Sequence, residues 1–148
     1  GSSAPMLALS QPSASRSRLI MPADSAKNSI LIYVVDDNPL LGEVTAQIIN
    51  TAGYQTRMFT NPIEANGALE KGEPKPQVLV TDFDLGKLVG FDLINTAREN
   101  IPGIKTLLVS GTVDREVLAK HPVQPDKFIP KPFKADDIIG GVEELLAG

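Results

Sequence analysis

The sequence contains no cysteine and no tryptophan, and its 148 residues include a single histidine, His121. The absence of cysteine excludes disulfide bonds, thiol chemistry and cysteine-ligated zinc sites. One histidine provides little material for a histidine-based triad or metal site. We interpret His121 as a partner of the C-terminal end of a helix dipole rather than as a catalytic base. No uninterrupted apolar run approaches the roughly 20 residues needed to cross a bilayer, so we expect a soluble, cytoplasmic protein without membrane contact.

The sequence also has no excess of basic residues. The chain has 14 basic and 18 acidic residues, a net charge of −4, which argues against direct nucleic-acid binding because such binding depends on Lys and Arg at phosphates. With 42% hydrophobic and 22% charged residues, the composition is that of an ordinary globular protein. The length suits one domain with a substantial core.

The first 29 residues differ in composition from the rest. They are rich in serine and alanine, and they hold three basic residues but only one acidic residue, Asp24. A segment of this kind buries too little apolar surface to offset the entropy lost on ordering. We therefore expect residues 1–29 to form a disordered tail, starting with a Gly-Ser-Ser cloning remnant, and residues 30–147 to form the folded domain.

From residue 30 onward, short apolar runs alternate with segments of helical periodicity. The runs predict strands over residues 30–35, 54–59, 77–81, 105–109 and 127–129. The periodic segments predict helices over residues 39–52, 62–71, 90–100, 112–120 and 134–146. Nearby prolines predict that the fourth helix is short or irregular. Five βα units of this kind predict an α/β fold in which a parallel sheet lies between helices.

The residues at the ends of the predicted strands are chemically distinctive. In open α/β sheets, ligands bind beyond the carboxyl ends of the strands. The polar residues at these positions are Asp36, Asp37, Asp82, Asp84, Ser110 and Lys131. Closely spaced carboxylates repel one another unless they share a proton or a cation. Oxygen ligands without histidine or cysteine indicate a hard ion, Mg²⁺ or Mn²⁺, and the lysine and hydroxyl suit a phosphoryl group beside it.

Four motifs carry a resemblance to a known family. They are VVDDN at 34–38, LVTDFDLGKLVGFDL at 79–93, LLVSG at 107–111 and PKPF at 130–133. Taken in order, each at the end of a predicted strand, they resemble the receiver domain of two-component response regulators over about residues 30–147. The resemblance implies a flavodoxin-like (βα)5 fold with strand order 2-1-3-4-5. It also implies a phosphorelay signalling domain, which is not an enzyme beyond its own phosphotransfer and dephosphorylation.

The resemblance assigns a role to each motif residue. Asp82 is implied as the phospho-acceptor, with Ser110 and Lys131 bonding the phosphoryl group. The implied Mg²⁺ site uses Asp37 directly, Asp36 through water, the Asp82 carboxylate and the backbone carbonyl of Asp84. Ser110 and Phe128 take the switch positions, and a cis Lys131–Pro132 bond shapes the pocket. The implied partners are a sensor histidine kinase or phosphotransfer protein, and a downstream protein effector or a fused output domain.

Three alternative interpretations stay open at this point. Asp36 and Asp37 could be ordinary helix N-caps. Because Phe128 lacks the hydroxyl of the tyrosine often found at this position, and the loop over residues 85–90 departs from the family pattern, the chain could be a receiver-like binding module that is never phosphorylated. Asp82 and Asp84 also resemble the Asp-x-Asp motif of haloacid-dehalogenase-type phosphatases, although that motif normally follows the first strand.

Overall fold

The computed structural model describes residues 27, 29–113 and 115–147. Most of the predicted tail, residues 1–26 and 28, lies outside the described residues. Lys27, within the predicted tail, contacts the folded domain: its Nζ donates to the carbonyl oxygen of Ala52 at 3.3 Å and lies 5.5 Å from the centre of the Tyr54 ring. Contacts with the domain therefore begin before residue 30.

Five parallel strands form one sheet in the order β2-β1-β3-β4-β5. The strands are β1 (Leu31–Val35), β2 (Gln55–Phe59), β3 (Val78–Asp82), β4 (Lys105–Ser110) and β5 (Lys127–Pro130). This arrangement confirms the predicted flavodoxin-like fold and its strand order. The third, fourth and fifth strands each extend one residue further than predicted, so Asp82 and Ser110 are the last residues of their strands.

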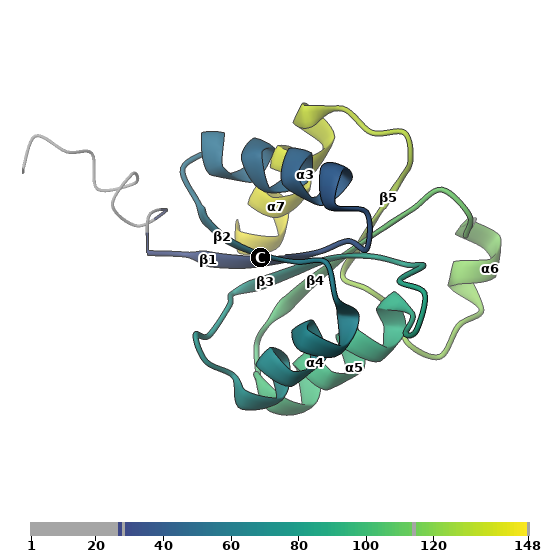
Figure 1. Ribbon diagram of the computed structural model, residues 1–148. Helices are drawn as coiled ribbons and strands as arrows, with labels where there is room; N and C mark the ends of the chain where they lie inside the picture. The colour runs from purple at the N-terminus through teal and green to yellow at the C-terminus, as the bar shows by residue number, and fades with distance from the viewer. Residues whose placement is uncertain (1–26, 28, 114, 148) are drawn as a thin grey trace, which may run out of the picture.

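Helices cover both faces of the sheet, as Figure 1 shows. They are α3 (Pro39–Thr51), α4 (Pro62–Lys71), α5 (Gly90–Asn100), α6 (Arg115–Ala119) and α7 (Ala135–Ala147). Helices α3 and α7 lie on one face, and α4 and α5 lie on the other. The five-residue α6 confirms the prediction of a short fourth helix. None of the helices among the described residues is long and apolar enough to span a bilayer.

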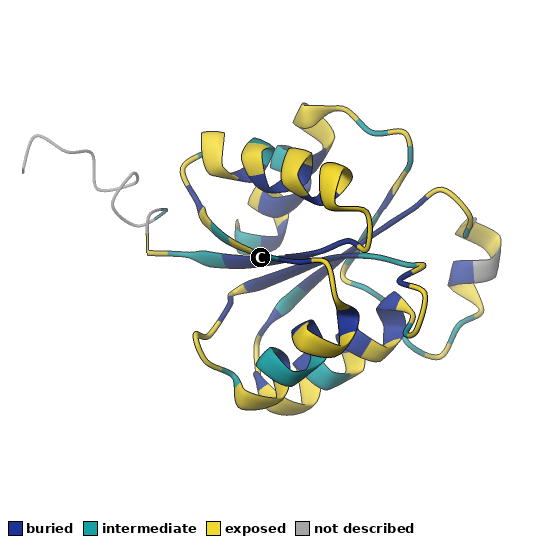
Figure 2. Ribbon diagram, viewed as in Figure 1, coloured by how far each residue is buried: buried dark blue, intermediate teal, exposed yellow. Residues whose placement is uncertain are grey.

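The core has two halves because the side chains of a strand alternate between the faces of the sheet. In β1, Tyr33 and Val35 pack toward α4 and α5, whereas Ile32 and Val34 pack toward α3 and α7. All four side chains are at most 1% exposed. Figure 2 shows the buried residues along the sheet and on the inner helix faces, with exposed residues on the outer faces. Burial on both faces explains the continuous apolar runs in the sequence.

The register of the sheet brings the strand ends level with one another. Val35 of β1 pairs with Thr81 of β3, and the next residue of β3, Asp82, pairs with Val109 of β4. Ser110 of β4 pairs in turn with Pro130 of β5. The residues that follow or end these strands are therefore collected at one edge of the molecule.

Candidate functional site

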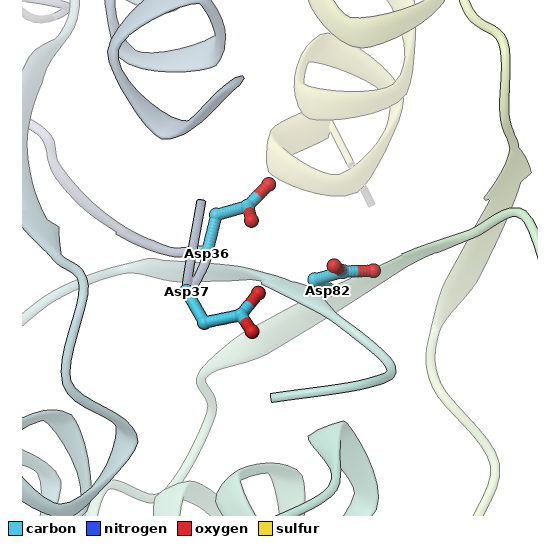
Figure 3. Close-up of side chains that lie close together, drawn as sticks. All are labelled: Asp36, Asp37 and Asp82. Carbon is cyan, nitrogen blue, oxygen red and sulfur yellow. The ribbon is translucent and has the colours of Figure 1, made fainter. Parts of the chain in front are cut away.

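Three carboxylates meet at the carboxyl ends of β1 and β3. Carboxylate oxygens of Asp36, Asp37 and Asp82 all lie within 4.8 Å of one another. Asp36 is buried, Asp82 is half-buried and Asp37 is exposed, and Figure 3 shows the three side chains extending in the same general direction. They line an open depression of about 380 Å³. The other lining residues are Asn38, Leu41, Asp84, Gly111, Thr112 and Lys131.

Lys131 provides positive charge at this cluster. Its Nζ lies 3.2 Å from Oδ2 of Asp82 and 4.0 Å from Oδ2 of Asp36. The lysine follows β5, and its peptide bond to Pro132 is cis, as the family resemblance implied. The geometry thus brings together Asp36, Asp82 and Lys131, which the sequence places on three different strand ends.

The two less exposed carboxylates are costly to ionise. Burial raises the pKa of Asp36, and the negative charge of Asp82 adds to this effect against the opposing hydrogen bond from the Asn38 amide. Burial also raises the pKa of Asp82, although the charge of Lys131 works in the other direction. Three oxygen donors with excess negative charge, of which Asp37 faces solvent, fit a hard divalent cation. The residues present are therefore suited to Mg²⁺.

Helix capping does not account for the paired acids. The N-cap of α3 is Asn38, whose Oδ1 accepts hydrogen bonds from the amides of Leu40 at 3.0 Å and Leu41 at 3.3 Å. Asp36 instead accepts the amide of Asn38 at 2.9 Å, which orients its carboxylate at the cluster. The capping interpretation of Asp36 and Asp37 is therefore wrong.

The remaining predicted site residues lie around the cluster. Asp84 lines the depression, and its Oδ1 accepts the amide of Gly86 at 3.3 Å. Ser110 is 2% exposed, and its Oγ accepts the amides of Thr112 and Val113. Phe128 lies outside the depression: it is half-buried on β5, and the Arg115 guanidinium carbon is 5.5 Å from its ring centre.

Sequence reasoning missed two contributors to the site. Thr112 lines the depression, and its Oγ1 lies 3.2 Å from the Ser110 Oγ. Gly90 packs beneath Asp82, since a Cβ atom at residue 90 would lie 2.7 Å from the carbonyl oxygen of Asp82. The signal for Thr112 was its place two residues after Ser110, whereas the close approach at Gly90 depends on packing of α5 against β3.

His121 lies two residues after the end of α6 and contacts α5. Its ring stacks on Phe91 with centroids 3.7 Å apart, and Phe91 in turn meets Phe83, the residue after Asp82, edge to face. The Nδ1 of His121 accepts the amide of Val123 at 3.0 Å. The stack on Phe91 packs the His121 ring against α5.

Comparison with known proteins identifies the family of this arrangement. A family model described as "Response regulator receiver domain" matches residues 32–143, which is more than half of the chain. The chain belongs to this family. Receiver domains are the signalling domains of two-component response regulators, and phosphorylation on aspartate and Mg²⁺ binding through acidic residues are typical of them. They interact with histidine kinases and output domains.

Several curated proteins and solved structures are similar to this receiver domain. The probable transcriptional regulatory protein TcrX of Mycobacterium tuberculosis is 25% identical over 79% of this chain and 50% of its own length. The sensor protein TorS of Escherichia coli is 28% identical over 81% of this chain and 13% of its own length. The crystal structure of a response regulator receiver protein from Sinorhizobium medicae superposes with a TM-score of 0.73 at 26% identity, covering 80% of this chain and 95% of that one. The chain thus spans half or less of these two curated relatives.

Proposed function

We propose that Asp82 is the phospho-acceptor of this receiver domain and that Asp36 and Asp37 hold Mg²⁺ beside it. The observation that supports this most strongly is the convergence of three carboxylates, within 4.8 Å of one another, with the Lys131 ammonium. Mn²⁺, another hard cation, suits the same oxygen donors. The backbone carbonyl of Asp84, in the loop after β3, is proposed as a further ligand.

The proposed reaction is a phosphoryl transfer between two side chains. A carboxylate oxygen of Asp82 attacks the phosphorus of a phosphohistidine, the phosphorus–nitrogen bond breaks, and its electron pair returns to the imidazole. When bound, Mg²⁺ neutralises charge on the transferring group. Lys131, which pairs with Asp82 before the reaction, then pairs with the phosphoryl oxygens. The product is an aspartyl phosphate.

The surface beside the depression suits a protein phosphodonor. Three apolar side chains on α3 are exposed: Leu40 at 71%, Leu41 at 42% and Val44 at 47%. Leu41 also lines the depression. An apolar patch next to a reactive carboxylate is appropriate for docking a protein that carries the phosphohistidine. We propose that a sensor histidine kinase or a phosphotransfer protein binds here, in the cytoplasm.

Phosphorylation is proposed to act by shifting the population between two conformations. Ser110 and Lys131 bond the new dianion, and the face around Phe128 repacks. The receiver then acts on a downstream protein effector or a fused output domain, and itself contacts neither nucleic acid nor membrane. The domain proposed for this role comprises residues 30–147, preceded by the tail.

Two alternative functions are a binding module and a phosphatase, and the acetyl phosphate experiment described below separates both from a receiver. A binding module that is never phosphorylated would keep the fold but form no adduct. A phosphatase using Asp82 and Asp84 needs both carboxylates at the substrate, and here Asp84 accepts the Gly86 amide of its own loop. Both carboxylates line the depression, and the match to the receiver family over residues 32–143 favours the receiver function over the phosphatase.

The test is intact-mass spectrometry after incubation with acetyl phosphate. With Mg²⁺ we expect a labile gain of about 80 Da, the mass of one phosphoryl group. The gain should be lost in Asp82→Asn and retained in the matched variant Asp84→Asn. Absence of an adduct in the unmodified chain would favour the binding module, and sustained turnover of phosphate esters would favour the phosphatase.

A further inference from the structure

The hydroxyl of Ser110 contacts two backbone amides and one side-chain hydroxyl of the loop that follows β4. Its Oγ accepts the amide of Thr112 at 3.1 Å and the amide of Val113 at 3.0 Å, and it lies 3.2 Å from Oγ1 of Thr112. A serine hydroxyl has two acceptor positions and one proton. Because amides only donate, the two N–H groups use both acceptor positions. The Ser110 proton therefore points to the Thr112 oxygen.

The burial of Ser110 limits the proton acceptors available to its hydroxyl. Ser110 is 2% exposed, so water is a poor replacement for the Thr112 oxygen as a proton acceptor, whereas Thr112 itself is exposed. A phosphoryl oxygen on Asp82 only accepts hydrogen bonds. Ser110 can therefore bond it only by donating its single hydroxyl proton. The Thr112 oxygen and a phosphoryl group would thus compete for the same proton.

We propose that Thr112 is a positioning residue that holds the Ser110 proton in the unphosphorylated protein and thereby opposes the switch. This inference rests on the proposed function, since it concerns the bond that Ser110 forms to a phosphoryl group on Asp82. Its consequence is that the Thr112 hydroxyl weakens the binding of any phosphoryl mimic at Asp82.

The experiment uses the full chain and beryllofluoride with Mg²⁺, with affinity measured by isothermal titration calorimetry. Thr112→Val keeps the branched shape but removes the competing oxygen, and we expect it to bind beryllofluoride about two- to tenfold more tightly, the range of one net hydrogen bond. Thr112→Ser keeps the hydroxyl and should bind within about twofold of the unmodified chain. Equal or weaker binding by Thr112→Val would overturn the proposal.

A second comparison separates this role from a general effect on the loop. In a Ser110→Ala background there is no proton to hold, so Thr112→Val should leave the affinity unchanged. If Thr112→Val tightens binding equally with and without Ser110, Thr112 acts on the loop and the proposal is wrong.

Failure of the inference and failure of the proposed function give different results. If the unmodified chain binds no beryllofluoride with Mg²⁺, the proposed phospho-acceptor site fails, and the role of Thr112 fails with it. If the unmodified chain binds and Thr112→Val binds no better, the site stands and only the role of Thr112 is rejected.

Discussion

The carboxylates at the two ends of the sheet have opposite surroundings. At the amino end, one oxygen of Asp126 accepts the Thr106 amide at 2.8 Å and the Thr106 hydroxyl at 3.0 Å, and an Arg98 guanidinium nitrogen lies 3.5 Å away. At the carboxyl end, Asp36 and Asp82 both lie near Lys131. Donors surround a single acid at one end, whereas acids crowd a lysine at the other. The first arrangement stabilises the fold, and the second costs stability until a cation or a phosphoryl group changes the charge balance.

The largest expected effect is at the amino end. Asp126→Ala removes the oxygen that accepts both the amide and the hydroxyl of the buried Thr106. We expect the free energy of unfolding to fall by about 2 kcal/mol, within the range for an unsatisfied buried donor. Urea unfolding monitored by circular dichroism measures this change. Glu99→Ala, at an exposed position of α5, is the matched control and should change stability by less than about 0.5 kcal/mol. If Asp126→Ala lowers the free energy of unfolding as little as Glu99→Ala does, Asp126 does not stabilise the amino end of the sheet as described.

The second expected effect, at the carboxyl end, is a gain rather than a loss of stability. Asp36→Asn keeps an oxygen for the Asn38 amide but removes a buried charge next to Asp82. Without Mg²⁺, we expect the free energy of unfolding to rise by on the order of 1 kcal/mol, because a buried charge that is incompletely compensated opposes folding. The same urea experiment in EDTA tests this. A loss of stability would show that the Lys131 contact outweighs the cost of burial.

The smallest expected effect is a pH dependence of the stability gained by Asp36→Asn. Since folding raises the pKa of Asp36 above its ordinary value, the folded protein holds this proton more tightly than the unfolded chain does. The resulting stability is present below the ordinary aspartate pKa and is lost as pH rises through the higher folded pKa. The advantage of Asp36→Asn should therefore be small near pH 4 and grow toward pH 7. Paired unfolding curves across this range measure it, and an advantage that shrinks with rising pH would reverse the assigned direction.

Local sequence patterns predicted the α/β class and the acids at the strand ends, and the family resemblance added the strand order. Continuous apolar runs mark strands buried on both faces, and parallel strand ends collect at one edge, so Asp36, Asp82 and Lys131 converge once the strand order is known. Pro39 and Pro62 likewise predict where helices start, because a proline ring suits the first turn, and the structure places Asn38 and Asn61 at the N-caps.

Contacts between distant residues were not predictable in this way. The stacking of His121 on Phe91 depends on how the segment after α6 packs against α5, and the sequence around His121 carries no periodic signal of that packing. The Arg98–Asp126 pair joins a helix to the start of a strand 28 residues away. The Ser110–Thr112 contact is local, but it depends on the turn that β4 makes at its end. In each case the determining feature is three-dimensional packing rather than residue spacing.

The acids at the carboxyl end of the sheet are proposed to form a cation site, whereas Asp126 at the amino end is not. Thermal unfolding with and without Mg²⁺ tests this most directly. At Mg²⁺ ten times its dissociation constant, we expect a gain of about 1.4 kcal/mol and a rise in Tm of about 4 °C. Asp37→Asn should lose most of this rise, whereas Asp126→Asn should keep it. No rise in the unmodified chain, or an equal rise in Asp37→Asn, would contradict the claim.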